Sequence, residues 1–347
     1  MTAANSRSNE APDAAGAEAA GPRAPACLYC SGRSYAPLYE GVRDRLGVVD
    51  GRWAFLACRE CGSAMLSPFP RPEQLAGFYP PVYTFGCCTD ASRPAIKRLL
   101  SRLEYRLFYG RQCEVEVRRI LRGVGWPGRG STKLLDVGCG HGLHLRAFRA
   151  RGLDVAGMDF QAEAVEYVTG QLGIPAVRTD FEHLPEAFPA ESFDVVTGLS
   201  VLEHVCDARG VLSACRGLLK PGGWFVALVP LIDSLQARML RSRWVVVTEA
   251  PRHVSLPSQE GVRRLFDAAG FEGVFLRPDS AVTCAGALAL SLLPAGATCH
   301  TYGAGGLARW AVRLAGGLAM LLALPWCAAE NYLLHRPATA LVFARKP

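Results

Sequence analysis

The chain has 347 residues, half of them hydrophobic, so it is long enough for one large domain with a sizeable core and smaller attachments. Its formal net charge of +7 is mildly basic, which suits an anionic partner or a membrane surface. The lysines and arginines do not form a dense stripe interleaved with aromatic residues, and this argues against nucleic-acid binding.

The N-terminal segment is rich in Ala, Gly, Pro, Ser and Asn, with scattered charges. This composition predicts a disordered tail over residues 1–24, because it offers too little apolar surface to fold. No apolar stretch follows Met1, so we expect no secretory signal and a cytoplasmic location.

Four of the thirteen cysteines form two C-x-x-C pairs, Cys27 with Cys30 and Cys58 with Cys61, separated by 27 residues. Two such pairs can supply tetrahedral coordination by four sulfurs, and a site made only of protein ligands is structural and not catalytic. We therefore predict a zinc-ribbon-like module over residues 25–85 that holds a structural zinc. Four free thiols in a loop-rich segment are the alternative.

A proline-rich run with two tyrosines follows the second cysteine pair: Pro68, Pro70, Pro72, Tyr79, Pro80, Pro81 and Tyr83. The module that ends here either covers a substrate cleft or is a packing appendage, and both interpretations stay open. Apolar residues at helical spacing then predict a helical lead-in over residues 90–128.

The most informative stretch is residues 134–142, with the sequence LLDVGCGHG. A buried strand ends here in Asp136 and in a turn with Gly138, Gly140 and Gly142, and helical spacing follows over 144–150. Such a corner lets backbone approach a nucleotide closely, because no Cβ intervenes. Counted from Gly138, a dinucleotide fingerprint needs its third glycine at the sixth position, where this chain has Leu143.

Four further strands are predicted downstream, at 153–159, 176–181, 192–200 and 224–229. The first ends in Asp159, the third is followed by a Leu-Glu-His-Val sequence, and a Lys-Pro-Gly-Gly turn precedes the fourth. The order and spacing of these motifs over residues 133–229 resemble the Rossmann-like, class I S-adenosylmethionine-dependent methyltransferases.

The resemblance implies a cofactor, S-adenosyl-L-methionine, and a set of residues that bind it. Backbone at Gly138, Cys139, Gly140 and Gly142 would approach its methionine portion, with Asp136 orienting the turn. Asp159 would accept the ribose hydroxyls and Phe160 would lie beside it. The adenine would contact Asp180 and Phe181, and Ser200 would lie at the end of the strand over 192–200.

Two places offer candidate catalytic residues. His204 lies just past the strand over 192–200, where acceptors sit, and would be a general base or would simply pack at a helix N-terminus. Arg252 and His253 precede a helix predicted to be capped by Ser258 and to end at Gly270. Arg252 would bind phosphate or carboxylate, or would belong to a solvated surface.

The C-terminal region contains strands at 273–277 and 339–345, which in the family form an antiparallel hairpin. Here a long apolar segment separates them, with no charge over 281–299 or 314–329. Arg309 and Arg313 precede the second stretch, which favours a helix lying in a membrane interface. The sharper interpretation is an apolar cap or anchor for a lipid-linked acceptor. The alternative is extra helices that pack together or form a homodimer.

The sequence therefore predicts an α/β fold, a doubly wound, seven-stranded Rossmann-like methyltransferase sheet with an N-terminal zinc-ribbon-like module and an apolar helical insert. The predicted methyltransferase domain covers 129–280, the insert 281–336 and the final strand 337–347. The predicted reaction is methyl transfer to a small-molecule, glycan or lipid-linked acceptor. An NAD- or nucleotide-sugar-dependent enzyme is disfavoured by Leu143, and a non-catalytic scaffold by the intact cofactor positions.

Overall fold

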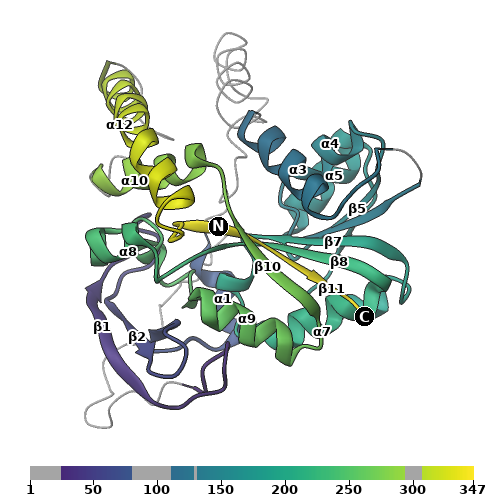
Figure 1. Cartoon of the computed structure of the whole chain (residues 1–347), viewed down its shortest axis with the longest axis horizontal. Coiled ribbons are helices and arrows are strands. Elements are labelled where there is room, and N and C mark those ends of the chain that lie inside the picture. Colours follow the sequence, from purple (N-terminus) through teal and green to yellow (C-terminus); the bar gives the residue numbers. More distant parts are fainter. Residues whose placement is uncertain (1–24, 80–110, 129–130, 294–306) are drawn as a thin grey trace, which may run out of the picture.

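The computed structural model describes residues 25–79, 111–128, 131–293 and 307–347 (Figure 1). The predicted tail over residues 1–24, Tyr83 and most of the predicted helical lead-in lie outside these ranges. The side chains of Arg309 and Arg313 also lie outside the description.

A seven-stranded sheet forms the centre of the molecule, with the strand order β10-β11-β8-β7-β4-β5-β6. Six strands run in the same direction, and β11 is inserted antiparallel between two of them, β8 and β10. The sheet predicted from the sequence is thereby confirmed. The strands are β4 Lys133–Val137, β5 Asp154–Asp159, β6 Ala176–Arg178, β7 Phe193–Leu199, β8 Leu219–Pro230, β10 Glu272–Pro278 and β11 Thr339–Arg345.

Helices cover both faces of this sheet (Figure 1). Successive residues of β4 serve the two faces in turn, since Leu134 belongs to one buried cluster and Leu135 to the other. One face carries α3, α4 and α5, and the other carries α7 and α9. These helices are α3 Arg111–Gly123, α4 Leu143–Arg149, α5 Ala162–Leu172, α7 Ala208–Leu218 and α9 Gln259–Ala268, and the short α6 Leu184–Ala187 follows β6.

Two predicted elements differ from the structure in their bounds. Strand β6 ends at Arg178, so Asp180 and Phe181 lie beyond it and not within it. Strand β8 begins at Leu219 and includes the glycines predicted as a turn. The pairing of β8 with β7 shifts register at this point, and Gly222 has a left-handed φ of 76°. The two glycines therefore make an irregularity within the strand.

The N-terminal module forms a second, four-stranded antiparallel sheet with the order β1-β2-β3-β9. Its strands are β1 Tyr35–Val42, β2 Trp53–Cys58, β3 Ala64–Ser67 and β9 Ser255–Leu256, followed after β3 by α1 Pro72–Leu75 and the 3-10 turn η1 Ala76–Phe78. The fourth strand comes from the segment that leads into α9. Cys58 and Phe266 also share one buried cluster, so the module and the large sheet have a common core.

Three helices lie near the end of the sheet where β8 and β10 finish, namely α8 Leu235–Leu240, α10 Ala281–Leu292 and α12 Leu307–Tyr332 (Figure 1). The remaining segments are the 3-10 turns η4 Leu202–His204, η5 Arg241–Arg243 and η6 Val247–Glu249. Helices α10 and α12 pack against each other. In the described part of the chain, one helical stretch, Leu314–Tyr332, is long and apolar enough to cross a membrane, and only 22% of its most apolar window is buried.

Candidate functional site

The glycine turn follows β4 at the carboxyl end of the parallel strands. Gly138, Gly140 and Gly142 all have left-handed φ angles, 71°, 50° and 68°. A Cβ on Gly142 would lie 2.8 Å from Cδ1 of Leu172, and one on Gly138 would lie 2.8 Å from Cγ2 of Val201. Side chains at these two positions would clash as well as strain the backbone, so the turn needs glycine there.

Two buried carboxyl groups hold this turn. The Thr197 hydroxyl donates a 2.6 Å hydrogen bond to Oδ1 of Asp136, and burial raises the pKa of Asp136 to about 6. Asp159 accepts hydrogen bonds from the amides of Gly140, at 2.8 Å, and Gln161, at 2.9 Å. Burial also raises the pKa of Asp159. The carboxylate predicted to bind ribose therefore also orders the glycine turn.

The other predicted cofactor residues lie at the ends of neighbouring strands. Phe160 follows β5 and is 45% exposed, and Cys139 is buried within the turn. The Asp180 carboxylate is 59% exposed and lies 2.8 Å from Nδ1 of His183. Phe181 is half-buried, and Ser200 follows β7 with an exposed side chain and a φ of 55°. Parallel strands bring their carboxyl ends to one edge, which gathers these residues.

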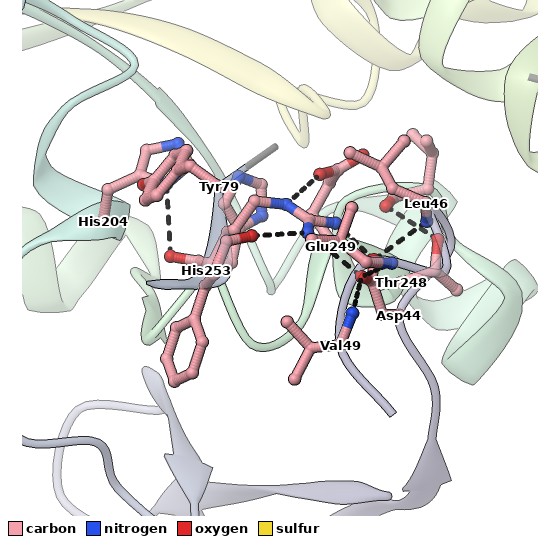
Figure 2. Close-up of polar contacts among 12 residues, drawn as sticks. Asp44, Leu46, Val49, Tyr79, His204, Thr248, Glu249 and His253 are labelled. Carbon is pink, nitrogen blue, oxygen red and sulfur yellow. Dashed lines mark hydrogen bonds and ion pairs between the residues drawn. The ribbon is translucent and has the colours of Figure 1, made fainter. Parts of the chain in front are cut away.

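His204 lies in a compact group of polar and aromatic side chains (Figure 2). Its Nδ1 is 2.9 Å from the Tyr79 hydroxyl and 3.1 Å from the carbonyl oxygen of Arg252. A carbonyl oxygen can only accept, whereas a hydroxyl can donate or accept. Both contacts are therefore satisfied when Nδ1 carries the proton, and the lone pair is then on Nε2.

His253 packs its ring edge-to-face on that of His204, with centroids 4.6 Å apart. Nδ1 of His253 donates to the carbonyl of Val246 at 2.7 Å. Burial lowers the pKa of His204 well below its usual value and that of His253 to about 4. Both imidazoles are consequently neutral near pH 7.

The guanidinium of Arg252 is fully buried and binds protein groups. It lies 2.5 Å from Oδ1 of Asp44 and 3.1 Å from Oε2 of Glu249, and it donates to the Phe78 carbonyl at 3.1 Å. The prediction that Arg252 binds an acceptor phosphate or carboxylate does not match this placement. Neither of the two interpretations of Arg252, a ligand-binding residue or part of a solvated surface, included a buried carboxylate partner, because Asp44 is 208 residues away in the chain.

Three residues of this group were absent from the predicted site. Tyr79 places its ring 5.8 Å from that of Phe160, so it links the predicted cofactor site to His204. Asp44 is distant in sequence, and nothing local marks it. Glu203 is buried, with an Oε2 that has no hydrogen-bond partner in the described ranges, and burial raises its pKa to about 8. Its position next to His204 in the sequence was the available signal.

Two sets of side chains have donor atoms close enough to hold a metal ion. In the first, the sulfurs of Cys27, Cys30, Cys58 and Cys61 all lie within 4.8 Å of one another. The Cys27–Cys61 distance is 3.6 Å and the Cys30–Cys58 distance is 3.5 Å. Zinc–sulfur bonds of about 2.3 Å in a tetrahedron place sulfurs about 3.8 Å apart, so the four thiols fit zinc. The second set is Glu203, His204 and His253.

A family model described as "Methyltransferase domain" matches residues 94–275, more than half of the chain. Ubiquinone biosynthesis O-methyltransferase from Thiobacillus denitrificans is 40% identical over 97 residues, covering 26% of this chain and 41% of the relative. The same enzyme from Idiomarina loihiensis is 41% identical over 127 residues, covering 35% and 49%. The match thus spans less than half the length of these relatives.

A solved S-adenosylmethionine-dependent methyltransferase from Archaeoglobus fulgidus is 19% identical to this chain. It superimposes with a TM-score of 0.45, covering 71% of this chain and 99% of that one. The resemblance predicted from the ordered motifs is confirmed by the family match. The chain belongs to the methyltransferase-domain family.

Proposed function

We propose that this protein transfers a methyl group from S-adenosyl-L-methionine to a hydroxyl group of a small molecule, with His204 as general base. One observation carries the proposal. Nδ1 of His204 is occupied by the Arg252 carbonyl and the Tyr79 hydroxyl, which leaves Nε2 as the basic atom, and the Tyr79 ring lies against Phe160 of the predicted cofactor site. The relatives named as O-methyltransferases support a hydroxyl acceptor.

The cofactor would be held by the residues at the carboxyl edge of the sheet. Backbone at Gly138, Cys139, Gly140 and Gly142 would meet its methionine portion, and Asp159 would take the ribose. Phe160, Asp180, Phe181 and Ser200 would line the nucleoside. When bound, this group supplies a methyl already activated by its sulfonium, so the protein must align the acceptor and manage one proton.

His204 would manage that proton. Because burial keeps the imidazole neutral near pH 7, Nε2 can accept the hydroxyl proton as the acceptor oxygen forms its new bond to carbon. The carbon–sulfur bond of the donor would break, S-adenosylhomocysteine would be the leaving group, and the proton would pass from the imidazole to solvent. Glu203 and His253 lie beside His204 and would influence how readily its imidazole accepts the proton. Arg252 would act as a positioning residue, since its side chain is buried.

The first test measures cofactor binding. Asp159→Ala and Gly140→Val should each weaken S-adenosylhomocysteine binding, measured by calorimetry. Losing the charge-assisted hydrogen bonds of Asp159 should cost about 1.5–3 kcal/mol, or roughly ten- to a hundredfold in affinity. Unchanged affinity in both variants would remove the assignment. NAD and nucleotide-sugars, measured on the same protein, should not bind.

The second test separates chemistry from binding. His204→Gln should keep S-adenosylhomocysteine affinity but lower the rate of labelled-methyl transfer to phenol, sugar and prenylated-phenol acceptors by about 10²–10⁴-fold. His335→Gln is the matched control, because this histidine is exposed and follows α12. Equal transfer rates in the two variants would exclude His204 as the base.

We further propose that the protein lies in the cytoplasm and binds the inner face of a membrane through α12. Its exposed leucines, Leu314, Leu318, Leu321 and Leu322, recur at helical spacing. The segment 281–336 contains Arg309, Arg313 and Arg336 but a single acid, Glu330, which is buried. Basic residues favour an anionic surface by about 1 kcal/mol each. This contact would present a lipid-linked acceptor.

Flotation with anionic liposomes tests this contact. The full chain should float, and Leu318→Glu/Leu322→Glu should not, because two charges on the apolar stripe oppose insertion. S-adenosylhomocysteine binding should be the same in both proteins. If the full chain stays unbound, the membrane proposal is wrong, and light scattering would then show whether the stripe joins two subunits.

A further inference from the structure

Two groups that contact Nδ1 of His204 are both linked to Arg252, whose side chain is buried. One is the carbonyl oxygen of Arg252 itself, 3.1 Å from Nδ1. The other is the Tyr79 hydroxyl, 2.9 Å from Nδ1. Nη1 of Arg252 donates to the carbonyl of Phe78, at 3.1 Å, and this residue precedes Tyr79. Movement of Arg252 would therefore displace both oxygens that accept the Nδ1 proton.

Arg252 is in turn fixed by a carboxylate of the N-terminal module. Asp44 lies between β1 and β2, and its side chain is 1% exposed. Its oxygens accept hydrogen bonds from the amides of Leu46 and Val48, both at 2.8 Å, and Val49, at 3.0 Å. Figure 2 shows this loop at one end of the group and His204 at the other. Such a loop carboxylate is already oriented before it meets a cation.

The ion pair between Asp44 and Arg252 is suited to keep the guanidinium in one position. Burial would raise the pKa of Asp44, but hydrogen bonds and charge from Arg252 outweigh it and hold that pKa below its usual value. A planar guanidinium can bond Asp44, Glu249 and the Phe78 carbonyl at once, whereas a lysine ammonium is a point charge on a flexible stem. The position thus depends on arginine as well as on positive charge.

We propose that Asp44 and Arg252 are positioning residues through which the N-terminal module fixes His204 in the Nδ1-protonated tautomer. The inference rests on the proposed function in one respect only, which is that Nε2 of this tautomer takes the proton of the substrate hydroxyl. The tautomer itself is a property of the protein with S-adenosylhomocysteine bound and no acceptor present. The carboxylate that determines the tautomer of His204, Asp44, would then come from the N-terminal module and not from the seven-stranded sheet.

The test is long-range ¹H–¹⁵N correlation on the full chain, labelled at histidine nitrogens and saturated with S-adenosylhomocysteine. Comparison with His204→Gln assigns the His204 signals. In the unsubstituted protein His204 should carry its proton on Nδ1. In Asp44→Asn and in Arg252→Lys, the ratio of the Nδ1–H to the Nε2–H tautomer should fall about tenfold, equal to about 1.4 kcal/mol. Calorimetry should show S-adenosylhomocysteine affinity unchanged.

Glu260→Gln is the matched control, since it breaks the exposed Arg264–Glu260 ion pair at 2.7 Å and should leave the tautomer ratio unchanged. Predominant Nε2–H in the unsubstituted protein overturns the proposal without any variant. An unchanged ratio in folded Asp44→Asn and Arg252→Lys overturns it as well. If the ratio shifts but His204→Gln retains methyl transfer, the positioning role stands and the general-base assignment falls.

Discussion

The N-terminal module and the C-terminal helices α10 and α12 are both attached to the same sheet, but they are attached in different ways. The module adds strand β3 to β9, shares a buried cluster with α9 and contributes Asp44 to a buried ion pair. The two helices are held near the C-terminal end of α12. There the buried Glu330 accepts hydrogen bonds from the backbone amide of Gln236, at 2.9 Å, and from its side-chain Nε2, at 3.1 Å. Farther along α12, Leu314 is 70% and Leu322 73% exposed.

The two kinds of attachment predict different consequences of substitution in the N-terminal module and in α12. Contacts of the module reach the residues around His204, so changes there should alter the stability and geometry of the candidate site. Helix α12 leaves a row of apolar side chains uncovered in the described structure, and contiguous exposed apolar surface usually marks an interaction. Changes there should alter association and leave the fold nearly intact.

Loss of the proposed zinc should have the largest effect. Cys58→Ser should reduce the metal content from about one zinc per chain to none, measured by elemental analysis. Structural zinc contributes about 10–16 kcal/mol to folding in small zinc peptides. Amide exchange should quicken in residues 25–67 and in α9, because the hydroxyl of Ser258, the N-cap residue of α9, donates to the Cys61 carbonyl.

Cys206→Ser is the control for this substitution, since Cys206 lies outside the four-cysteine cluster and is half-buried. It should retain the metal. Freshly purified, reduced protein without zinc would contradict the site, and two metal ions per chain would indicate that Glu203, His204 and His253 also bind one.

Removing Arg252 should have the next largest effect. Arg252→Ala leaves the buried Asp44 carboxylate without its cation, which typically costs about 3–5 kcal/mol. Arg264→Ala breaks an exposed pair and should cost less than about 1 kcal/mol. Urea unfolding followed by circular dichroism would measure both. Similar losses in the two variants would show that the buried pair contributes no more to stability than the exposed one.

A pair of leucines makes the comparison between the two attachments direct. Leu66→Ala, in the buried strand β3, should lower the free energy of unfolding by about 2–5 kcal/mol. Leu322→Ala, on the exposed face of α12, should change it by less than about 0.5 kcal/mol. The same denaturation experiment measures both. A large loss from the second substitution would place α12 in a buried interface between subunits.

The smallest predicted effect is on pH dependence. The pKa of His253 is about 4 in the folded chain and 6.5 when unperturbed, so the unfolded chain binds more protons between these values. Stability should therefore fall as pH drops from 6.5 toward 4. His253→Asn, which cannot titrate but can donate to Val246, should reduce this fall between pH 7 and pH 5. The exposed His335→Asn is the control, and equal slopes in all three proteins would refute the assignment.

Much of the sheet could be predicted because its signals are local. Strand β11 has the bounds expected from its apolar run, and the glycine turn follows β4 as its spacing requires. The four cysteines that the structure brings together were identified from two C-x-x-C pairs. Ser258 caps α9 as predicted, with its hydroxyl accepting from the Gly261 amide at 2.9 Å.

The environment of His204 could be predicted only in part. Its own position follows from the end of β7, but its partner Tyr79 is 125 residues away in the chain. Glu203 adjoins His204 in the sequence, but its burial, which is unusual for an acid, is a property of the tertiary structure. Tyr79 belongs to the proline-rich run, but that pattern does not indicate which group its hydroxyl contacts.

The sequence by itself determined the fold family, the order of the strands along the chain, the four-cysteine cluster and the glycine turn. These depend on residue type and spacing along a short stretch of chain, where backbone geometry transmits the pattern directly. Only the tertiary structure decided that Arg252 is buried and that Asp44 neutralises it. An arginine can lie in water or in the core, and the choice depends on whether a carboxylate arrives from elsewhere to offset desolvation.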